Sequence, residues 1–503
     1  GLAGAGASSG MAMAHWEIQG WMILILGWVF VPFYSRSMVY TMPEFLERRY
    51  NPQSRTILSV ISLVSYVLTK VAVTVYAGGL VFQQVFGIKE LWGIDFFWIA
   101  AIGLVVLTAL YTIFGGMKSV LYTSVLQTPI LLLGSLIILV LGFKELGGWD
   151  EMMRVCGAVT VNDYGDTMTN LIRSNDDANF PWLGALIGSA IIGFWYWCTD
   201  QFIVQRVLSG KNEKEARRGT IFGAYLKLLP VFLFLIPGMI AFALHQKYIG
   251  AGGEGFLPML ANGTANADAA FPTLVAKLLP AGVKGLVVCG ILAALMSSLA
   301  SLFNSSAMLF TIDFYKRFRP ETPEKKLVGI GQIATVVIVI LGILWIPIMR
   351  SVGDVLYTYL QDVQSVLAPG IAAAFLLGIC WKRTSAQGGM WGLIAGMIIG
   401  LTRLGAKVYY SNAGEVADST FKYLFYDMNW LFFCGWMFLF CIIVVIVVSL
   451  ATEAPTAEKI QGLVFGTATK EQKAATRASW DHWDIIHTVI ILAITGAFYW
   501  YFW

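Results

Sequence analysis

The sequence predicts an all-α polytopic membrane protein, and three observations carry this prediction. Hydrophobic residues make up 57% of the 503-residue chain and charged residues only 13%, which leaves too little polar surface to cover a water-soluble body of that size. Apolar runs of about 20 residues, enough to cross a bilayer core of roughly 30 Å, recur along almost the whole chain. The segments that join these runs alternate in charge.

The apolar runs predict about twelve complete membrane spans and one partial helix at 1–10. The expected spans are 15–35, 54–86, 92–114, 119–146, 182–207, 219–246, 280–315, 327–349, 353–381, 387–406, 428–451 and 482–503. The chain opens at Gly1 inside the small-residue stretch of the partial helix, so we expect that the first part of this helix is missing.

Basic residues gather in alternate connecting segments, and the positive-inside rule places these segments in the cytoplasm. They are Arg36, Arg48, Arg49 and Arg55; Lys118; Lys211, Lys214, Arg217 and Arg218; Lys316, Arg317, Arg319, Lys325 and Lys326; and Lys382 and Arg383. The segments between them are acidic or neutral. The clearest is 148–181, with six acidic residues against two basic ones, and it is expected to face outward.

Composition and motifs exclude several other classes of protein. The net charge of +4 is too small to indicate a nucleic-acid partner, and the six cysteines show neither metal-ligand spacing nor a disulfide framework. No phosphate-binding G-x-x-x-x-G-K-[ST] motif is present, and no Ser/His/Asp or metal-ligand pattern indicates an enzyme. The polar stretch 452–481 lacks an apolar pattern that could form a core, which indicates a linker.

Charged side chains inside apolar spans cost at least ~2.5 kcal/mol on insertion scales and usually line a pathway or pair internally. Four stand out: Glu17, Lys70, Asp200 and Lys227. Glu17, beside Trp16, is either a solute-binding carboxylate or an interfacial anchor. Lys227 lies well inside an apolar run, which favours function. Lys70 and Asp200 fit either a pathway or a structural ion pair, with Arg206 a candidate partner of Asp200.

Two further patterns suggest binding groups. The four consecutive aromatic residues 194–197 cover all sides of a helix, so some face the bundle interior and can stack on a sugar ring or close a gate; an interfacial belt is the alternative. In the stretch AALMSSLASLFNSS, the hydroxyls of Ser297 and Ser298 and the carbonyl of Ala294 can supply oxygen ligands to sodium. Close helix packing is the alternative for these serines.

The motifs TMPEFLERRYN, WYWCTDQFIVQR, YLKLLPVF and MSSLASLFNSS resemble the sodium/solute symporter family, specifically its sodium/glucose cotransporter branch, which includes bacterial sodium/galactose transporters. The resemblance runs through essentially the whole chain. It implies the LeuT-like fold, in which two five-helix repeats of inverted topology enclose the solute. On that fold the inverted-repeat core is 1–381, additional transmembrane helices occupy 382–451, 452–481 is a cytoplasmic linker, and 482–503 is a C-terminal transmembrane helix.

The resemblance also implies roles for individual residues. Glu17, Lys227 and Gln361 would form hydrogen bonds with the sugar hydroxyls. Trp16 and Tyr357 would be outer-gate aromatics, and Tyr196 would be the inner-gate ring under the sugar, with Trp197 beside it. The coupling sodium ion would be held by Ala294, Ser297 and Ser298.

Three positions depart from the family pattern. Ser124 stands where relatives often have an aspartate of a second sodium site, which favours one sodium ion per solute. Gly193 stands where the family tends to have a polar side chain near the sugar, and Gln364 stands where threonine is common. These departures leave the identity of the sugar open.

The function expected from these observations is sodium-coupled symport of a glucose- or galactose-like monosaccharide by alternating access, by a multi-pass protein of the plasma or inner membrane. One alternative is the same fold carrying another solute, such as an inositol, a sialic acid or an organic acid, with sodium or protons. A second alternative is a sugar-gated channel or sensor. The sequence leaves the oligomeric state open.

Overall fold

The structure is a computed structural model of residues 1–503, and it describes all of them except 38, 40, 261–262, 353–354 and 413–416. Some side chains inside helices also lie outside the description: 111, 113–121, 123–124, 126 and 350–352. Lys118 and Ser124 belong to that group, so the structure gives no contact for either.

Helices make up most of the described structure, and two short strands, β1 (Glu90–Leu91) and β2 (Ile94–Asp95), form one antiparallel hairpin. The α-helices are α1 (Leu2–Ser9), α2 (Ala14–Glu17), α3 (Gly20–Ile25), α4 (Val31–Ser37), α5 (Met42–Arg49), α6 (Pro52–Ser65), α7 (Ala72–Phe86), α8 (Phe96–Leu146), α9 (Trp149–Gly157), α10 (Trp182–Gly193), α11 (Gln201–Leu208), α12 (Glu213–Pro230), α13 (Ile236–Gly250), α14 (Ala270–Leu278), α15 (Ala281–Met308), α16 (Lys316–Phe318), α17 (Glu324–Val352), α18 (Leu356–Cys380), α19 (Ala386–Asn412), α20 (Thr420–Lys422), α21 (Trp430–Ala451), α22 (Ala457–Ile460), α23 (Lys470–Ala478) and α24 (His482–Tyr501).

Turns with other helical spacing connect or interrupt these helices. Two are 3-10 turns, η1 (Gly10–Met13) and η6 (Ala267–Ala269). The others are π turns: η2 (Leu26–Phe30), η3 (Tyr66–Val71), η4 (Phe194–Thr199), η5 (Val231–Leu235), η7 (Leu309–Tyr315) and η8 (Tyr423–Asp427). π turns are frequent at functional sites, because they widen the helix and change the direction of side chains.

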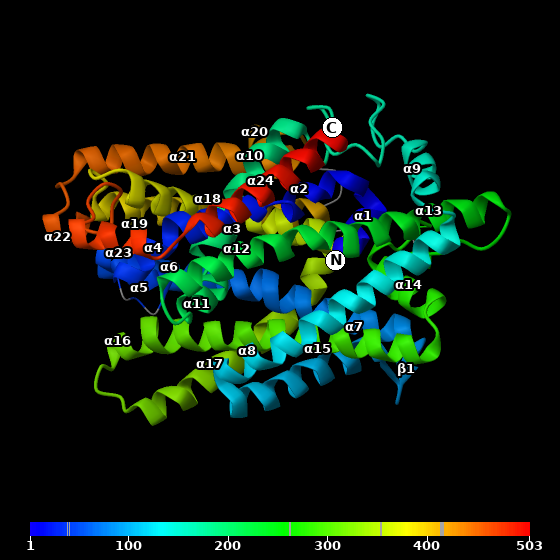
Figure 1. Ribbon diagram of the computed structural model, residues 1–503, viewed down its shortest axis with the longest axis horizontal. Coiled ribbons are helices and arrows are strands. Elements are labelled where there is room, and N and C mark those ends of the chain that lie inside the picture. The colour runs from blue at the N-terminus through cyan, green and yellow to red at the C-terminus, as the bar shows by residue number, and fades with distance from the viewer. Residues whose placement is uncertain (38, 40, 261–262, 353–354, 413–416) are drawn as a thin grey trace.

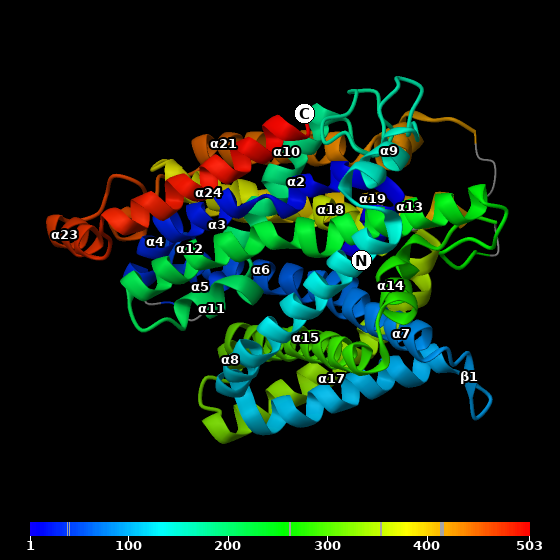
Figure 2. The same ribbon diagram turned by 45° about the vertical axis from the view of Figure 1, so that its right-hand side comes forward.

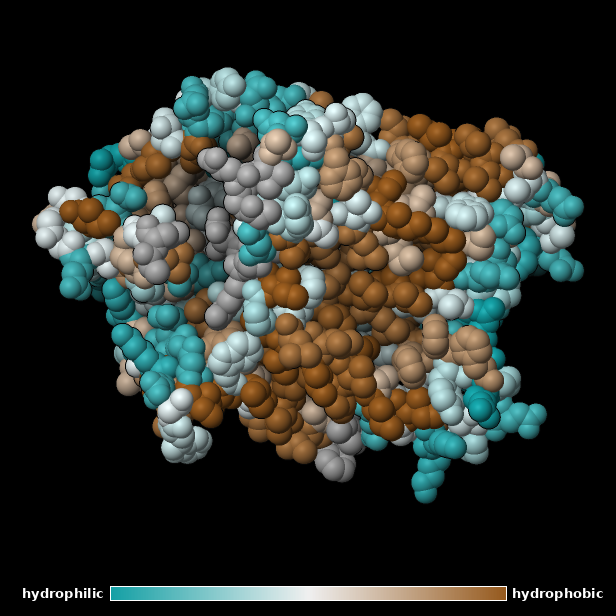
Figure 3. All heavy atoms as spheres, turned by 180° about the vertical axis from the view of Figure 1, so that it is seen from behind, coloured by the Kyte–Doolittle hydropathy of each residue, from teal (hydrophilic) through white to brown (hydrophobic). Residues whose placement is uncertain are grey.

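The molecule is a multi-pass membrane protein. Eleven helical segments in the described chain are long and apolar enough to cross a bilayer, and a shorter apolar segment, Phe96–Leu110, adds to them. The eleven are Leu2–Ser37, Pro52–Phe86, Gln127–Leu146, Trp182–Thr199, Glu213–Gly250, Ala281–Phe318, Glu324–Met349, Leu356–Cys380, Ala386–Asn412, Trp430–Ala451 and His482–Tyr501. Figure 3 shows the corresponding band of hydrophobic residues between two polar ends.

The two polar ends differ in charge as the sequence predicts. In Figures 1 and 2, α5, α11 and α23, which belong to or adjoin basic segments, lie at the left, whereas α9 and β1 lie at the right. The acidic segment 148–181 contains α9 and therefore lies at the right-hand end. The positive-inside rule predicts that the left end faces the cytoplasm.

One helical element contains two of the predicted spans. The expected spans 92–114 and 119–146 lie in a single helical element, α8, of 51 residues. A straight helix of that length would span about 76 Å, far more than a bilayer core. The ribbon of α8 instead reverses direction at the lower left of Figures 1 and 2, so its two apolar ends cross separately. The two expected spans therefore run in opposite directions, although both belong to one continuous helical element.

The N-terminal span is interrupted rather than continuous. Gly10, the C-cap of α1 and first residue of η1, has a φ of +64°, and a Cβ there would lie 2.1 Å from the carbonyl oxygen of Met168. Glycine is required on both counts. The next residue, Met11, donates its N–H to that same carbonyl at 2.8 Å, which fixes the entry into the four-residue helix α2.

Segment 452–481 forms the short helices α22 and α23 and packs against the bundle. Lys459 donates to the Glu47 carbonyl at 2.8 Å, and the Phe465 N–H donates to the Ile379 carbonyl at 2.8 Å. Arg36 reaches Thr476 at 2.8 Å. The segment is therefore attached to the ends of several helices at well-separated points.

Candidate functional site

A cavity of ≈ 220 Å³ lies inside the bundle, where α2, α10, η4, α12 and α18 meet. All seven residues expected to bind or gate a solute line it: Trp16, Glu17, Tyr196, Trp197, Lys227, Tyr357 and Gln361. The other lining residues are Gln19, Ile192, Gly193, Leu360 and Gln364. Residues spread over more than 340 positions of sequence thus converge on one cavity.

Local helix geometry explains how these side chains reach the cavity. Tyr357 and Gln361 are one turn apart at the start of α18, so they share a face. Lys227 lies one turn before Pro230, which cannot continue the hydrogen-bond ladder and is followed by the π turn η5. Tyr196 and Trp197 lie in the π turn η4, directly after Gly193. Interrupted helices therefore line most of the cavity.

Glu17 and Lys227 form an ion pair in the cavity wall. The Nζ atom of Lys227 lies 2.6 Å from Oε2 of Glu17, and the hydroxyl of Tyr357 donates to the other carboxylate oxygen, Oε1. Glu17 is buried, and the Lys227 ammonium also lies 5.3 Å from the centre of the Trp197 ring. The two opposite charges neutralise each other, so the wall presents a polar but nearly neutral surface.

Two other polar atoms of the cavity residues have no partner within the described structure. They are Oε1 of Gln361 and Nε1 of Trp16, and both residues are buried. A buried polar group without a hydrogen bond costs roughly 1–3 kcal/mol. Two residues that line the cavity, Gln361 and Trp16, therefore carry one acceptor and one donor that lack hydrogen bonds.

A second ion pair lies on the far side of Tyr196. Lys70, in η3, pairs with Asp200, which also accepts hydrogen bonds from the Tyr66 hydroxyl at 2.9 Å and the Phe202 N–H at 3.1 Å. The Lys70 ammonium lies 5.0 Å from the centre of the Tyr196 ring. Tyr196 thus contacts the cavity and this buried charge pair, which supports a structural ion pair as the role of Lys70 and Asp200.

The residues expected to hold sodium lie in α15, beside a different cavity. Ala294 and Ser298 line a space of ≈ 240 Å³, one helical turn apart, and residues 1–4, at the start of α1, also line it. Ser297 is half-buried and does not line this space. Leu356 lines the second cavity and Tyr357 the first, so the start of α18 borders both. Within the described residues, no group of three His, Cys, Asp or Glu side chains could hold a metal ion.

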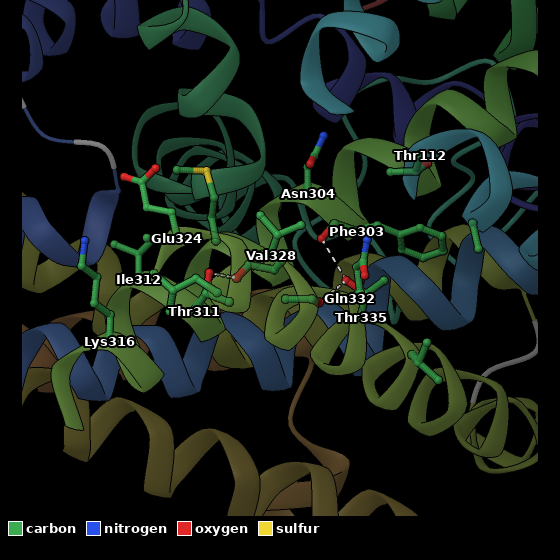
Figure 4. Close-up of a pocket in the computed structure, with 16 residues that line it drawn as sticks. Thr112, Phe303, Asn304, Thr311, Ile312, Lys316, Glu324, Val328, Gln332 and Thr335 are labelled. Carbon is green, nitrogen blue, oxygen red and sulfur yellow. Dashed lines mark hydrogen bonds between the residues drawn. The ribbon is translucent and has the colours of Figure 1, made fainter. Parts of the chain in front are cut away.

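A larger cavity of ≈ 490 Å³ lies elsewhere, between α8, α15 and α17 (Figure 4). Its wall is mainly apolar, and the Thr335 hydroxyl donates to the Gly331 carbonyl at 2.9 Å. The Thr311 hydroxyl likewise donates to a carbonyl of its own helix, that of Ala307. None of the residues expected to bind solute or sodium lines this cavity, so volume does not identify the candidate site.

Sequence reasoning assigned no role to Gln19, although it lines the cavity two residues after Glu17. Its Nε2 atom donates to the Ser189 carbonyl at 2.8 Å. The only signal in the sequence is its place beside Glu17 in an apolar span. Gln364, which sequence analysis noted as a departure, also lines the cavity.

Known proteins resemble this chain over most of its length. The model of the sodium:solute symporter family matches residues 1–396. The chain is 35% identical over 480 residues to sodium/myo-inositol cotransporter 2 of Homo sapiens, which covers 93% of this chain and 70% of the relative. It is 37% identical over 471 residues to sodium/glucose cotransporter 1 of Ovis aries, which covers 90% of this chain and 70% of the relative. The family predicted from motifs is confirmed, and transporters rather than enzymes are the relatives.

A solved structure shares the fold. It is described as the substrate-bound outward-open state of a Na⁺-coupled sialic acid symporter, and it aligns with a TM-score of 0.67 at 20% identity, over 90% of this chain and 86% of that chain. At this identity the likeness concerns the fold alone. The predicted LeuT-like fold is confirmed.

Proposed function

We propose that this chain, which belongs to the sodium:solute symporter family, carries a glucose- or galactose-like monosaccharide across the plasma or inner membrane together with sodium. Sodium-coupled solute symport is the activity of the family. The identity of the solute, the roles of the cavity residues and the membrane are the parts proposed here.

The chemistry of the cavity is the observation that carries the choice of solute. Its volume of ≈ 220 Å³ is below the roughly 300–1,000 Å³ typical of drug-sized ligands, so the occupant is small. Unpartnered acceptor and donor atoms on Gln361 and Trp16 suit a molecule with hydroxyl groups, which both donate and accept. The rings of Tyr196 and Trp197 provide apolar faces on which a sugar ring can stack.

The paired charges favour a neutral solute over an acid. The Lys227 ammonium already has the Glu17 carboxylate as its partner, so a solute carboxylate would have to compete with it at 2.6 Å. A carboxylate would also face the unpartnered oxygen of Gln361, an acceptor that cannot bond to it. Sialic acid and simple organic acids are therefore weaker candidates than a sugar.

A cyclic polyol such as an inositol is the second candidate. It has the size and the hydroxyl groups that the cavity requires, and one of the relatives named above is a sodium/myo-inositol cotransporter. The two candidates differ chiefly in the ring oxygen and the hydroxymethyl group of the sugar. The unpartnered groups of the cavity do not discriminate between them.

Sodium at Ala294, Ser297 and Ser298 would couple to the solute through α18. The start of α18 borders both cavities. An ion that stabilises one position of this helix would therefore also shift Tyr357 in the wall of the solute cavity. One charge crossing 100 mV contributes ~2.3 kcal/mol, and a tenfold sodium gradient adds ~1.4 kcal/mol. Together they sustain a solute gradient of several hundred-fold, roughly.

Alternating access then requires two gates. Trp16 and Tyr357 would close the cavity on the outer side, and Tyr196 would close it on the inner side. The contact of the Tyr196 ring with the Lys70 ammonium, which is paired with Asp200, supports this role. Movement of the segment that carries Lys70 or of the segment that carries Asp200 would change this contact. Rocking of one group of helices against the other would expose the cavity to each side in turn.

Competition experiments test the choice of solute. Uptake of labelled D-glucose into proteoliposomes is measured with unlabelled D-galactose, myo-inositol, sialic acid or lactate as competitor, while sodium and pH are varied separately. We expect competition by neutral sugars or inositol, dependence on sodium, and little dependence on a proton gradient. Competition chiefly by the acids, or uptake driven by protons without sodium, would contradict the proposal.

A further inference from the structure

The amide of Gln19 is held in one orientation in the cavity wall. Gln19 lies in the bend between α2 and α3, and its side chain is 2% exposed. Its Nε2 atom donates to the Ser189 carbonyl at 2.8 Å. A carbonyl can only accept a hydrogen bond, so the nitrogen of the amide must face Ser189. The oxygen, Oε1, is thereby directed to the other side.

Gly193 provides the space in which Oε1 lies. A Cβ at position 193 would approach this oxygen to 2.3 Å and the Cδ atom of Gln19 to 3.0 Å. Only glycine leaves room for the amide in this position. Gln19 and Gly193 both line the cavity. The carbonyl of the Gln19 amide therefore occupies the volume that a side chain at position 193 would otherwise fill. The two residues form one unit in the packing.

We propose that Gln19 is a specificity-determining residue whose fixed carbonyl oxygen accepts a hydrogen bond from one solute hydroxyl. Within the described residues no donor bonds to Oε1, whereas the carboxylate oxygens of Glu17 are both engaged by Lys227 and Tyr357. Gln19 and Gln361 therefore supply two amide oxygens that lack donors. A solute meets them with hydroxyl groups, while a carboxylate or a missing hydroxyl leaves them unpaired.

This inference rests on the proposed function for its class of solute, but binding tests it separately from transport. The full chain in detergent with sodium is titrated with D-glucose, D-galactose, myo-inositol, the monodeoxyglucoses and D-glucuronate, and dissociation constants come from thermal stabilisation. For the wild type we expect one monodeoxy analogue to bind roughly 5- to 100-fold more weakly than its parent. Glucuronate is expected to stabilise least.

Two variants act on the Gln19 oxygen by different routes. Gln19→Met keeps the length of the side chain and removes the acceptor. Gly193→Ser leaves Gln19 in place but displaces its amide, because the new Cβ would meet a flexible side chain. In both variants the one discriminating monodeoxy analogue should bind less than about threefold more weakly than its parent. In the double variant this ratio should differ little from that of the single variant with the larger effect. Gly193→Ser also serves as the test if Gln19→Met does not fold.

Gln205→Met is the matched control, since Gln205 is a buried glutamine that donates to Ser305 and does not line the cavity. It should keep the wild-type pattern of monodeoxy penalties. The proposal is overturned if Gln19→Met and Gly193→Ser keep every penalty of the wild type, or if glucuronate binds as well as glucose. Loss of the monodeoxy discrimination in Gln19→Met and Gly193→Ser, but not in Gln205→Met, supports the Gln19 inference. If the same protein shows no sodium-driven uptake, that result contradicts the proposed symport. Absence of stabilisation by every neutral polyol contradicts both.

Discussion

The ammonium of Lys227 lies 2.6 Å from the carboxylate of Glu17, although 210 positions of sequence separate the two residues. Each charge alone would cost at least ~2.5 kcal/mol inside a bilayer on insertion scales. Together they form a neutral pair in the wall of the cavity, where Tyr357 also contacts the carboxylate. The pair joins α2, α12 and α18 at the point where a solute is proposed to bind.

Replacing Glu17 by Gln removes one charge of this pair. The uncompensated Lys227 ammonium should destabilise the fold by ~3–5 kcal/mol and abolish most solute uptake. In the double variant Glu17→Gln/Lys227→Met the unpaired charge is gone, so the thermal midpoint should recover while uptake stays lost. Thermal unfolding and uptake are the two measurements. A single variant that keeps both stability and uptake would refute a binding role for Glu17.

Ser298→Ala should weaken sodium dependence before solute recognition. Loss of one oxygen ligand to a cation costs ~1.5–3 kcal/mol, which corresponds to a roughly 10- to 100-fold higher sodium requirement. The solute KM at saturating sodium should stay close to the wild-type value. Sodium titrations of uptake give both constants.

Ser306→Ala is the control for this prediction, because Ser306 is buried on the same helix and lines neither cavity. Its sodium requirement should match that of the wild type. An equal loss of sodium and solute affinity in Ser298→Ala would count against the assignment of this serine to the cation.

Asp200→Asn should leave Lys70 without its partner. Asparagine can still cap α11 through its side-chain oxygen, so the change removes the charge but not the cap. We expect a stability loss of ~3–5 kcal/mol, most of it recovered in Lys70→Met/Asp200→Asn. Arg154→Gln, which breaks an exposed pair with Glu151, should leave the thermal midpoint unchanged. A midpoint for Asp200→Asn equal to that of this control would show that the buried pair contributes nothing.

Tyr196→Phe and Tyr196→Leu separate the ring from the hydroxyl. The phenylalanine variant keeps a ring that can stack on a sugar, so its solute affinity should stay within about twofold of the wild type. The leucine variant loses a stacking contact worth ~0.5–1.5 kcal/mol and should bind roughly 2- to 10-fold more weakly. Solute dissociation constants measured in sodium decide between these outcomes. Equal affinities in the two variants would remove the stacking role.

Hydropathy predicted most of the spans, because crossing a bilayer imposes length and composition on every helix, although two of the expected spans lie in the single helical element α8. Motif resemblance predicted the set of residues that the structure brings together around one cavity. The sequence did not identify the partner of Asp200. Arg206 is close to it in sequence and was the candidate, whereas the actual partner, Lys70, lies 130 positions away. The Gln19–Ser189 bond likewise depends on packing between distant helices, which no local pattern reports.

The segment 452–481 shows another limit of composition. Its lack of an apolar pattern predicts a linker without a core of its own. The contacts of Lys459, Phe465 and Thr476 with the bundle arise from surfaces contributed by other helices. The polar composition of the segment therefore did not predict its attachment to the bundle.

Concentrative uptake by the purified full chain tests the central claim most directly. Labelled D-glucose, D-galactose and myo-inositol are supplied to sealed proteoliposomes with an inward sodium gradient and an inside-negative potential. The account predicts accumulation of at least one of these solutes well above the external concentration, collapse of that accumulation when a sodium ionophore is added, and no accumulation by Glu17→Gln/Lys227→Met. Equilibration without accumulation, or accumulation that persists without sodium, would contradict it.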